Sequence, residues 1–151
     1  MLRPARDHEA GVMAEMSRTL IEDGLAWRYT PPRMASLISD AETTALVAHD
    51  GARIQGFAVM QFGDAHAHLA LLCVQAALQR RGIGHRLMAW LLASAQVAGI
   101  ESIRLELRAD NAMALSFYRQ LGFNQTQVVP GYYDGLIAAR RMTLRLHEAP
   151  T

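Results

Sequence analysis

The stretch Gln79-Arg80-Arg81-Gly82-Ile83-Gly84 lies between an apolar run and a segment with helical periodicity. The apolar run, residues 69–74, is short and continuous, as in a strand that is buried on both faces. The segment after the stretch reaches Gly99, a residue type that commonly follows the end of a helix. Its residues at helical spacing are Ile83, Leu87, Trp90, Leu91, Ser94 and Ala98. The pattern therefore predicts a strand, a glycine-containing turn and a helix in succession.

The composition of this turn favours binding of an anion. Glycine lets backbone N–H groups approach a ligand closely, and those at a helix start lie at the positive end of its dipole. Arg80 and Arg81 add donors for phosphate oxygens. A P-loop ending in Gly-Lys-Ser/Thr is absent, and Leu87 stands where a dinucleotide fingerprint needs its third glycine. We interpret the stretch as a pyrophosphate-binding turn, with a tight turn and a solvated basic flank as the alternative.

The overall composition is that of a single globular domain over residues 1–151. Hydrophobic residues make up 51% and charged residues 19%, which argues against a disordered chain. The net charge of +1 gives no lead toward nucleic acid or an anionic membrane. Cys73 is the only cysteine, so no intramolecular disulfide forms, and its apolar surroundings predict packing rather than catalysis. No apolar run approaches the ~20 residues of a membrane span, and no signal-peptide pattern is present, so we expect a cytoplasmic protein.

Periodicity and turn signals along the rest of the chain predict an α/β (α+β) fold. After a short extended opening, helices are expected from Asp7 to Gly24 and from Thr30 to Ile38. Strands are predicted at residues 43–48, 53–62, 66–74, 102–108, 123–129 and 136–146, with a further helix at 111–121 and a loop at 130–135. An antiparallel front half and a back half of strand–helix crossovers predict a mixed, mostly antiparallel central sheet with helices on both faces.

A second group of polar residues follows the pyrophosphate-binding turn along the chain. Glu106 lies on the non-aliphatic face of a predicted strand. Asn111 stands at a helix start and Tyr118 seven residues later, so both occupy one helix face. Neighbouring positions of the two strand–helix units would bring these three side chains to one cleft. The alternatives are pairing of Glu106 with Arg104 or Arg108, capping by Asn111, and core packing by Tyr118.

The segment from Cys73 to Phe123 resembles the core of the GNAT superfamily of acetyl-CoA-dependent N-acetyltransferases. The motifs that carry the resemblance are Gln79-Arg80-Arg81-Gly82-Ile83-Gly84 and Asn111, Ala114, Phe117, Tyr118, Leu121, Gly122 and Phe123. Within that superfamily, Leu105-Glu106-Leu107-Arg108 and the later Tyr132-Tyr133 are similar to the bacterial enzymes that acetylate the N-terminus of a ribosomal protein. Ala76 replaces the usual proline, and the loop around Tyr132 is shorter. Residues 1–65 match in architecture only.

The resemblance implies a site for acetyl-CoA and two catalytic residues. It assigns Leu72, Cys73 and Val74 to the thioester and pantetheine arm, Gln79, Arg80, Arg81, Gly82, Ile83, Gly84 and His85 to the pyrophosphate, and Asn111 to the pantetheine arm. Glu106 would be the general base and Tyr118 the general acid. The chemistry agrees, because an α-amino group with a pKa of about 8 arrives mostly protonated and a carboxylate can remove the proton through a water. Attack on the thioester needs no covalent enzyme intermediate.

The expected function is transfer of an acetyl group to a primary amine, first a peptide or protein N-terminus and second a small-molecule amine. Trp27, Tyr29, Tyr132 and Tyr133 are candidates for the acceptor site, with simple packing as the alternative. A non-catalytic acyl-CoA-binding module is a second class. A nucleic-acid binder that uses the arginine clusters is disfavoured by the near-neutral charge.

The expected partners are acetyl-CoA and the amine, without nucleic acid or membrane, and a homodimer stays open. His66 and His68 share a strand face, but no third ligand is in view, so no metal site is predicted.

Overall fold

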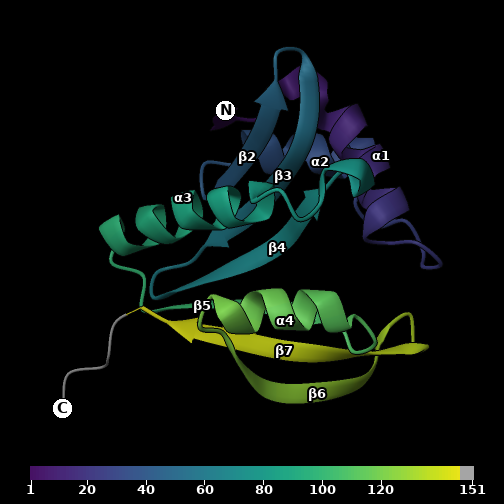
Figure 1. The fold of residues 1–151 in the computed structure, drawn as a ribbon, viewed down its shortest axis with the longest axis vertical. Coiled ribbons are helices and arrows are strands. Elements are labelled where there is room, and N and C mark those ends of the chain that lie inside the picture. The colour runs from purple at the N-terminus through teal and green to yellow at the C-terminus, as the bar shows by residue number, and fades with distance from the viewer. Residues whose placement is uncertain (147–151) are drawn as a thin grey trace.

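The computed structural model describes residues 1–146, which fold around one seven-stranded sheet (Figure 1). The strands are β1 (Leu2–Pro4), β2 (Thr43–Asp50), β3 (Arg53–Phe62), β4 (His66–Val74), β5 (Ser102–Arg108), β6 (Asn124–Tyr133) and β7 (Ile137–Arg145). The helices are α1 (Ala10–Leu20), α2 (Pro31–Ser39), α3 (Ile83–Val97) and α4 (Ala112–Gln120), with short 3-10 turns at Asp7–Glu9 and Ala76–Leu78. The spatial order of the strands is β1-β2-β3-β4-β5-β7-β6. Among the strands of residues 1–146, only the β4–β5 pair is parallel, which confirms the mixed, mostly antiparallel sheet.

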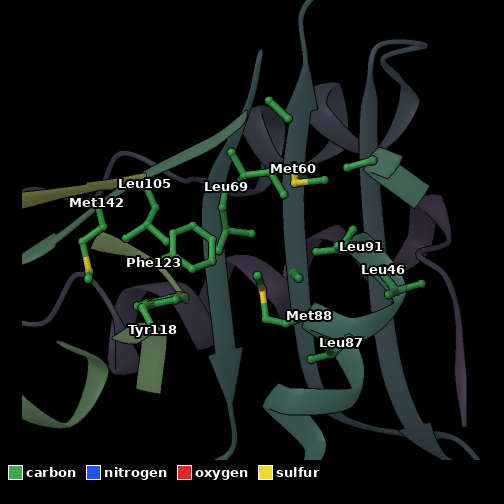
Figure 2. Close-up of a cluster of buried hydrophobic side chains, with 14 of the residues drawn as sticks. Leu46, Met60, Leu69, Leu87, Met88, Leu91, Leu105, Tyr118, Phe123 and Met142 are labelled. Carbon is green, nitrogen blue, oxygen red and sulfur yellow. The ribbon is translucent and has the colours of Figure 1, made fainter. Parts of the chain in front are cut away.

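Each face of the sheet carries its own hydrophobic core, so the prediction of helices on both faces is confirmed. On one face, Leu87, Met88 and Leu91 of α3 and Tyr118 of α4 pack with Leu46, Met60, Leu105, Phe123 and Met142 (Figure 2). On the other, Met13 and Met16 of α1 and Met34 and Leu37 of α2 pack with Val47, Phe57, Val59, Leu71 and Cys73. Full burial of one such side chain contributes roughly 1.5–3 kcal/mol. The two cores hold the sheet between two helical layers.

The alternation of β5 sorts its side chains between these two faces. Ile103, Leu105 and Leu107 belong to the core under α3 and α4. Arg104 and Glu106 therefore point to the face that carries α1 and α2. These helices pack over β2, β3 and the end of β4, so the polar side chains of β5 are left partly accessible.

The strands β4 and β5 separate partway along their length. Their pairing covers His66 to His68 against Ser102 to Arg104, whereas β4 continues to Val74 and β5 to Arg108. A register shift between β3 and β4 at Val59/Met60 adds a bulge just where this pairing ends. In the described part of the chain, the edge of β4 that faces β5 therefore has no strand partner beyond His68, and a gap opens through the sheet.

Two expectations about local structure are wrong, and one residue of the helical pattern lies outside the buried stripe. Trp90 is 42% exposed, because the buried stripe of α3 runs through Leu87, Leu91 and Ala95 and leaves Trp90 on the outer side. The predicted loop at 130–135 is shorter, since β6 continues through Pro130 and Gly131 to Tyr133. Proline is tolerated there because β6 is an edge strand and its register shifts between Val129 and Tyr133. The first helix also ends earlier than Gly24, at Leu20.

Among residues 1–146, no helix combines the length and apolar character needed to cross a bilayer.

Candidate active site

A cleft of about 880 Å³ occupies the gap between the separated halves of β4 and β5. Its walls come from the α1–α2 loop, β4, β5, the start of α4 and the β6–β7 hairpin. The sequence-predicted residues that line it are Leu72, Cys73, Val74, Gln79, Glu106, Asn111, Tyr118, Tyr29, Tyr132 and Tyr133. The structure thus brings the two candidate catalytic residues and one stretch of the predicted acetyl-CoA site to the same space.

The glycine-containing turn lies directly after the β4 wall of the cleft. Gly82 is the N-cap of α3 and has a φ of 81°, a conformation that glycine adopts without a steric penalty. The first N–H bonded across this helix start is that of Arg86, which donates to the Gly82 carbonyl oxygen at 3.0 Å. Helix geometry leaves the earlier N–H groups, including those of Ile83 to His85, without intrahelical acceptors. This helix start therefore has the donors and dipole that an anionic group needs.

The two glycines of the turn have different physical roles. A Cβ atom on Gly82 would meet no atom within 4 Å, so only its backbone conformation requires glycine. A Cβ atom on Gly84 would lie 3.3 Å from the ring of Phe117, so Gly84 permits close packing of α3 against α4. The Ile83 side chain is buried in the core, which leaves its backbone as the part available to a ligand.

Gln79 and Asn111 hold the backbone on either side of the cleft. The Gln79 amide donates to the Val74 carbonyl oxygen at 3.2 Å and so ties the turn to the end of β4. The Asn111 side chain caps α4 by accepting from the N–H of Ala114 at 3.0 Å. Asn111 therefore caps the helix, as the alternative from sequence expected, and its side chain also lines the cleft.

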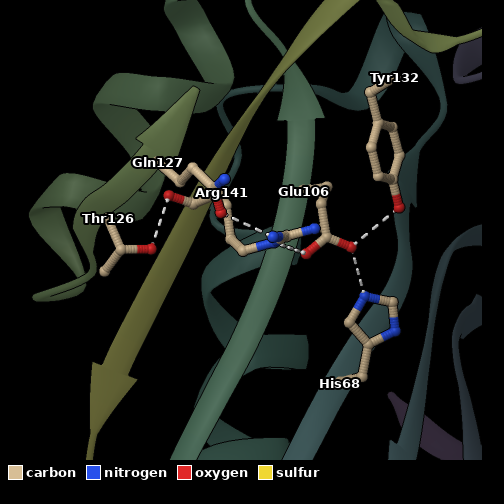
Figure 3. A network of polar contacts seen from close by, with 6 residues as sticks. All are labelled: His68, Glu106, Thr126, Gln127, Tyr132 and Arg141. Carbon is tan, nitrogen blue, oxygen red and sulfur yellow. Dashed lines mark hydrogen bonds and ion pairs between the residues drawn. The ribbon is translucent and has the colours of Figure 1, made fainter. Parts of the chain in front are cut away.

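Glu106 is held by three side chains that converge on its carboxylate (Figure 3). Oε1 lies 2.8 Å from Nε2 of His68 and 3.2 Å from the Tyr132 hydroxyl, and Oε2 lies 3.3 Å from Nε of Arg141. These contacts, led by the one with His68, lower the pKa of Glu106 below its usual value although partial burial opposes the shift. Glu106 is therefore ionised at neutral pH. Neither Arg104 nor Arg108, the partners weighed from sequence, pairs with it.

Tyr118 reaches the cleft from the opposite face of the sheet. Its ring is packed edge-to-face against Phe117 and Phe123, with centroid distances of 5.1 and 5.6 Å. Burial raises the pKa of its hydroxyl well above the usual value. The phenol thus stays protonated at neutral pH, as a proton donor must.

The α1–α2 loop and the β6–β7 hairpin are joined across one end of the cleft. Asp134 accepts the N–H of Ala26 at 2.8 Å and pairs with the Arg28 guanidinium at 2.9 Å. Glu22, which is buried, accepts the N–H of Arg28 at 2.7 Å and the hydroxyl of Ser17 at 2.9 Å. Together these bonds fix the α1–α2 loop beside the cleft.

Trp27 differs from the other aromatic candidates for the acceptor site. Its indole packs against the core under α1 and α2, and the Arg18 guanidinium lies 4.8 Å above the ring. Trp27 therefore lies behind the cleft wall, whereas Tyr29, Tyr132 and Tyr133 line the cleft itself.

The sequence did not identify His68 and Arg141 as partners of Glu106. His68 lies on β4 and Arg141 on β7, the two strands that flank β5. The available signal in the sequence was that Glu106 needs cationic or hydrogen-bond-donating neighbours if it is buried. Within residues 1–146, no three metal-ligating side chains gather in one place, and His66 bonds to the Ser102 hydroxyl at 2.6 Å. Burial raises the pKa of the Cys73 thiol to about 12, so no reactive thiolate is available in the cleft.

Two solved structures share the fold of this chain over almost its whole length. The crystal structure of Ard1 from Thermoplasma volcanium superposes with a TM-score of 0.86 at 25% identity, covering 98% of each chain. That of the ribosomal-protein-S18-alanine N-acetyltransferase from Escherichia coli superposes with a TM-score of 0.85 at 24% identity, covering 99% of this chain and 96% of that one.

A family model described as acetyltransferase (GNAT) domain matches residues 16–146, and the chain belongs to this family. The ribosomal protein bS18-alanine N-acetyltransferase of Salmonella typhimurium is 36% identical over 81 residues, which are 54% of this chain and 55% of that enzyme. Its Escherichia coli counterpart is 33% identical over the same extent. These matches span about half the length of the curated relatives.

Proposed function

We propose that this protein transfers the acetyl group of acetyl-CoA to a primary amine at the N-terminus of a peptide or protein. One observation carries the proposal: Glu106 and Tyr118 line the same cleft from opposite faces of the sheet, in the gap where β4 and β5 stop pairing. The family and its named relatives support it, since the relatives acetylate a ribosomal protein at an alanine.

The residues present fit acetyl-CoA as the donor. The pyrophosphate has a helix start with free N–H groups at Ile83 to His85 and two nearby arginines, Arg80 and Arg81. The extended pantetheine arm has the unpaired edge of β4 from Leu72 to Val74 beside it, where backbone groups lack a strand partner. Acetyl-CoA supplies an activated acyl group as a thioester.

In this proposal Glu106 receives the proton of the incoming ammonium. Its lowered pKa makes it a weak base, so direct capture of a proton from an amine with a pKa of about 8 is uphill. A water between the amine and the carboxylate eases the transfer, as expected from the sequence. His68 lies between this carboxylate and the solvent, because its imidazole contacts Glu106 at 2.8 Å and reaches the cleft surface. We assign His68 as a positioning residue that holds the carboxylate and links it to solvent.

Tyr118 completes the reaction in this proposal. Once the freed amine has attacked the thioester carbonyl, an N–H on the free edge of β4 stabilises the oxyanion. The C–S bond then breaks, and the Tyr118 hydroxyl gives its proton to the leaving thiolate sulfur. The nitrogen loses its second proton as the amide forms, and this proton restores the phenol through solvent. The first proton, taken up by Glu106, leaves to solvent, so that a protonated amine gives one amide, one thiol and one released proton.

The test is a panel of amines incubated with the protein and acetyl-CoA, with thiol release and product mass as readouts. Peptides with a free N-terminus should be acetylated at the α-amino group, and matched peptides with a blocked N-terminus should not. Turnover of small amines alone would show that the acceptor is a small-molecule amine, the second candidate class. Absence of thiol release with every amine would leave only an acyl-CoA-binding module.

A further inference from the structure

A second hollow of about 460 Å³ continues the active-site cleft along the same face of the sheet. The two spaces share three lining residues, Gln61, His68 and Glu106. Away from the cleft, the second hollow extends past Arg104 on β5 and His66 on β4. We call this second hollow the Arg104 groove. It starts at the carboxylate that would receive the amine proton and leads away from the acetyl-CoA side.

No carboxylate lies directly across from Arg104, and Glu106, two residues along the same strand, pairs instead with His68 and Arg141. The cross-strand partners of Arg104 are His68 on β4 and Thr143 on β7, and neither is acidic. Arg104 is exposed, and no ion pair joins it to any residue within 1–146. Arg141, the other arginine of the groove, is already paired with Glu106 at 3.3 Å. The groove therefore presents one guanidinium that is available to a ligand.

The position of Arg104 fits the second or third residue of an acceptor chain. Arg104 and Glu106 are two residues apart on one strand and share a face, which separates them by ~7 Å along β5. An extended peptide advances by the same ~3.3 Å per residue. A chain whose amine lies near Glu106 and which runs along the groove would bring its second or third side chain beside Arg104.

We propose that the Arg104 groove binds the acceptor just downstream of its N-terminal amine and that Arg104 pairs with an acidic side chain there. The acceptor is then a polypeptide with Asp or Glu at its second or third position. This inference rests on the proposed N-terminal acetylation. A guanidinium can hold a carboxylate by two parallel hydrogen bonds, whereas a lysine or arginine at that point would be repelled.

The test compares peptides that are identical except for Glu, Gln or Lys at position two, and a second set varied at position three. We expect kcat/KM with one of the Glu peptides to exceed that of its Gln form by about tenfold, with the Lys form lower still, and the difference to shrink as salt rises. In Arg104→Glu the Lys peptide should have the highest kcat/KM and the Glu peptide the lowest. In Arg104→Gln the three peptides should have similar kcat/KM values. Arg53→Glu, at the exposed β2–β3 hairpin at the other end of β3, should keep the order of the unmodified protein.

Two outcomes separate this inference from the proposed function. If the Gln peptides are acetylated but Glu gives no advantage at either position, the Arg104 assignment is wrong and the acetylation stands. If Arg104→Glu folds, as judged by its melting temperature, and keeps the original order, the assignment is also wrong. If no peptide of either set is acetylated, the proposed function itself fails and the groove with it.

Discussion

Nε2 of His68 lies 2.8 Å from Oε1 of Glu106, although 38 residues separate the two in the chain. His68 occupies the last row in which β4 and β5 are paired, and Glu106 lies just beyond it. An ionised carboxylate can only accept a hydrogen bond, so Nε2 carries the proton. The contact therefore stands at the point where the sheet opens, between the cleft and the Arg104 groove.

Loss of the His68 imidazole should shift the pH dependence of the reaction. His68 is the largest cause of the lowered pKa of Glu106, so His68→Ala raises that pKa toward its usual value. Because Glu106 must be ionised to accept a proton, the acidic limb of the kcat/KM profile should move to higher pH. The measurement is a pH profile of acetyl transfer. His49→Ala, in the β2–β3 hairpin region, is the matched control and should leave the limb in place, and an unmoved limb in His68→Ala would contradict the coupling.

Removal of the Tyr118 hydroxyl should affect turnover far more than acetyl-CoA affinity. A general acid contributes roughly 10²–10⁴-fold, so Tyr118→Phe should lower kcat by at least about 100-fold. Stability should change little, since the ring contacts with Phe117 and Phe123 remain. Tyr133→Phe is the matched variant, because Tyr133 lines the same cleft and its pKa is also raised by burial. A large loss in Tyr133→Phe with none in Tyr118→Phe would move the acid role to Tyr133.

Alanine substitution of two glycines at opposite ends of α3 distinguishes an effect of backbone strain on stability from an effect on ligand binding. Gly82 and Gly99 have φ values of 81° and 75°, and a Cβ atom on either would meet nothing within 4 Å. Alanine at either position should therefore cost about 1–2 kcal/mol of stability. Only Gly82→Ala alters the helix start proposed for the pyrophosphate. We expect saturating acetyl-CoA to raise the melting temperature of Gly99→Ala as in the unmodified protein and to raise that of Gly82→Ala much less. Equal shifts in both variants would place the pyrophosphate elsewhere.

Glu9 should make the fold sensitive to acid. The Arg3 guanidinium, at 2.7 and 2.8 Å, and the N–H of Arg6 lower the pKa of Glu9 to about 2. A lowered pKa in the folded state stabilises the fold above the usual range of glutamate, and this contribution is lost as pH falls from about 4.5 toward 2. Glu9→Gln should reduce the free energy of unfolding at pH 7 by about 2–3 kcal/mol, with the deficit vanishing in acid.

Denaturant unfolding at several pH values measures the contribution of Glu9. Glu15→Gln, on the exposed side of α1, is the control and should stay within about 0.5 kcal/mol of the unmodified protein. A Glu9→Gln protein as stable as this control at pH 7 would show that the ion pair with Arg3 contributes nothing net.

Local pattern was sufficient for the elements that surround the part of the cleft proposed for acetyl-CoA. The continuous apolar run of β4 and the alternation of Ile103, Leu105 and Leu107 indicate burial, and the glycine turn indicates a helix start after a positive φ, each within a few neighbouring residues. Tyr118 and Asn111 could be assigned to one wall because helical spacing alone decides which residues share a face. These features needed no knowledge of the strand order.

The part of the cleft proposed for the acceptor depends on contacts between strands that are far apart in sequence. Whether Glu106 meets Arg104, Arg108 or His68 is decided by the register between β4 and β5, which the pattern of β5 does not contain. Pro130 and Gly131 signal a loop in isolation, yet on an edge strand the sheet accommodates both through a bulge. Tertiary pairing overrides the local signal in each case.

A crystal structure with acetyl-CoA bound would locate the donor relative to Glu106 and Tyr118. We expect the pyrophosphate against the N–H groups of Ile83 to His85, the pantetheine arm along Leu72 to Val74, and the thioester sulfur within hydrogen-bonding distance of the Tyr118 hydroxyl. A ligand located outside the gap between β4 and β5, or a sulfur beyond the reach of that hydroxyl, would contradict this expectation.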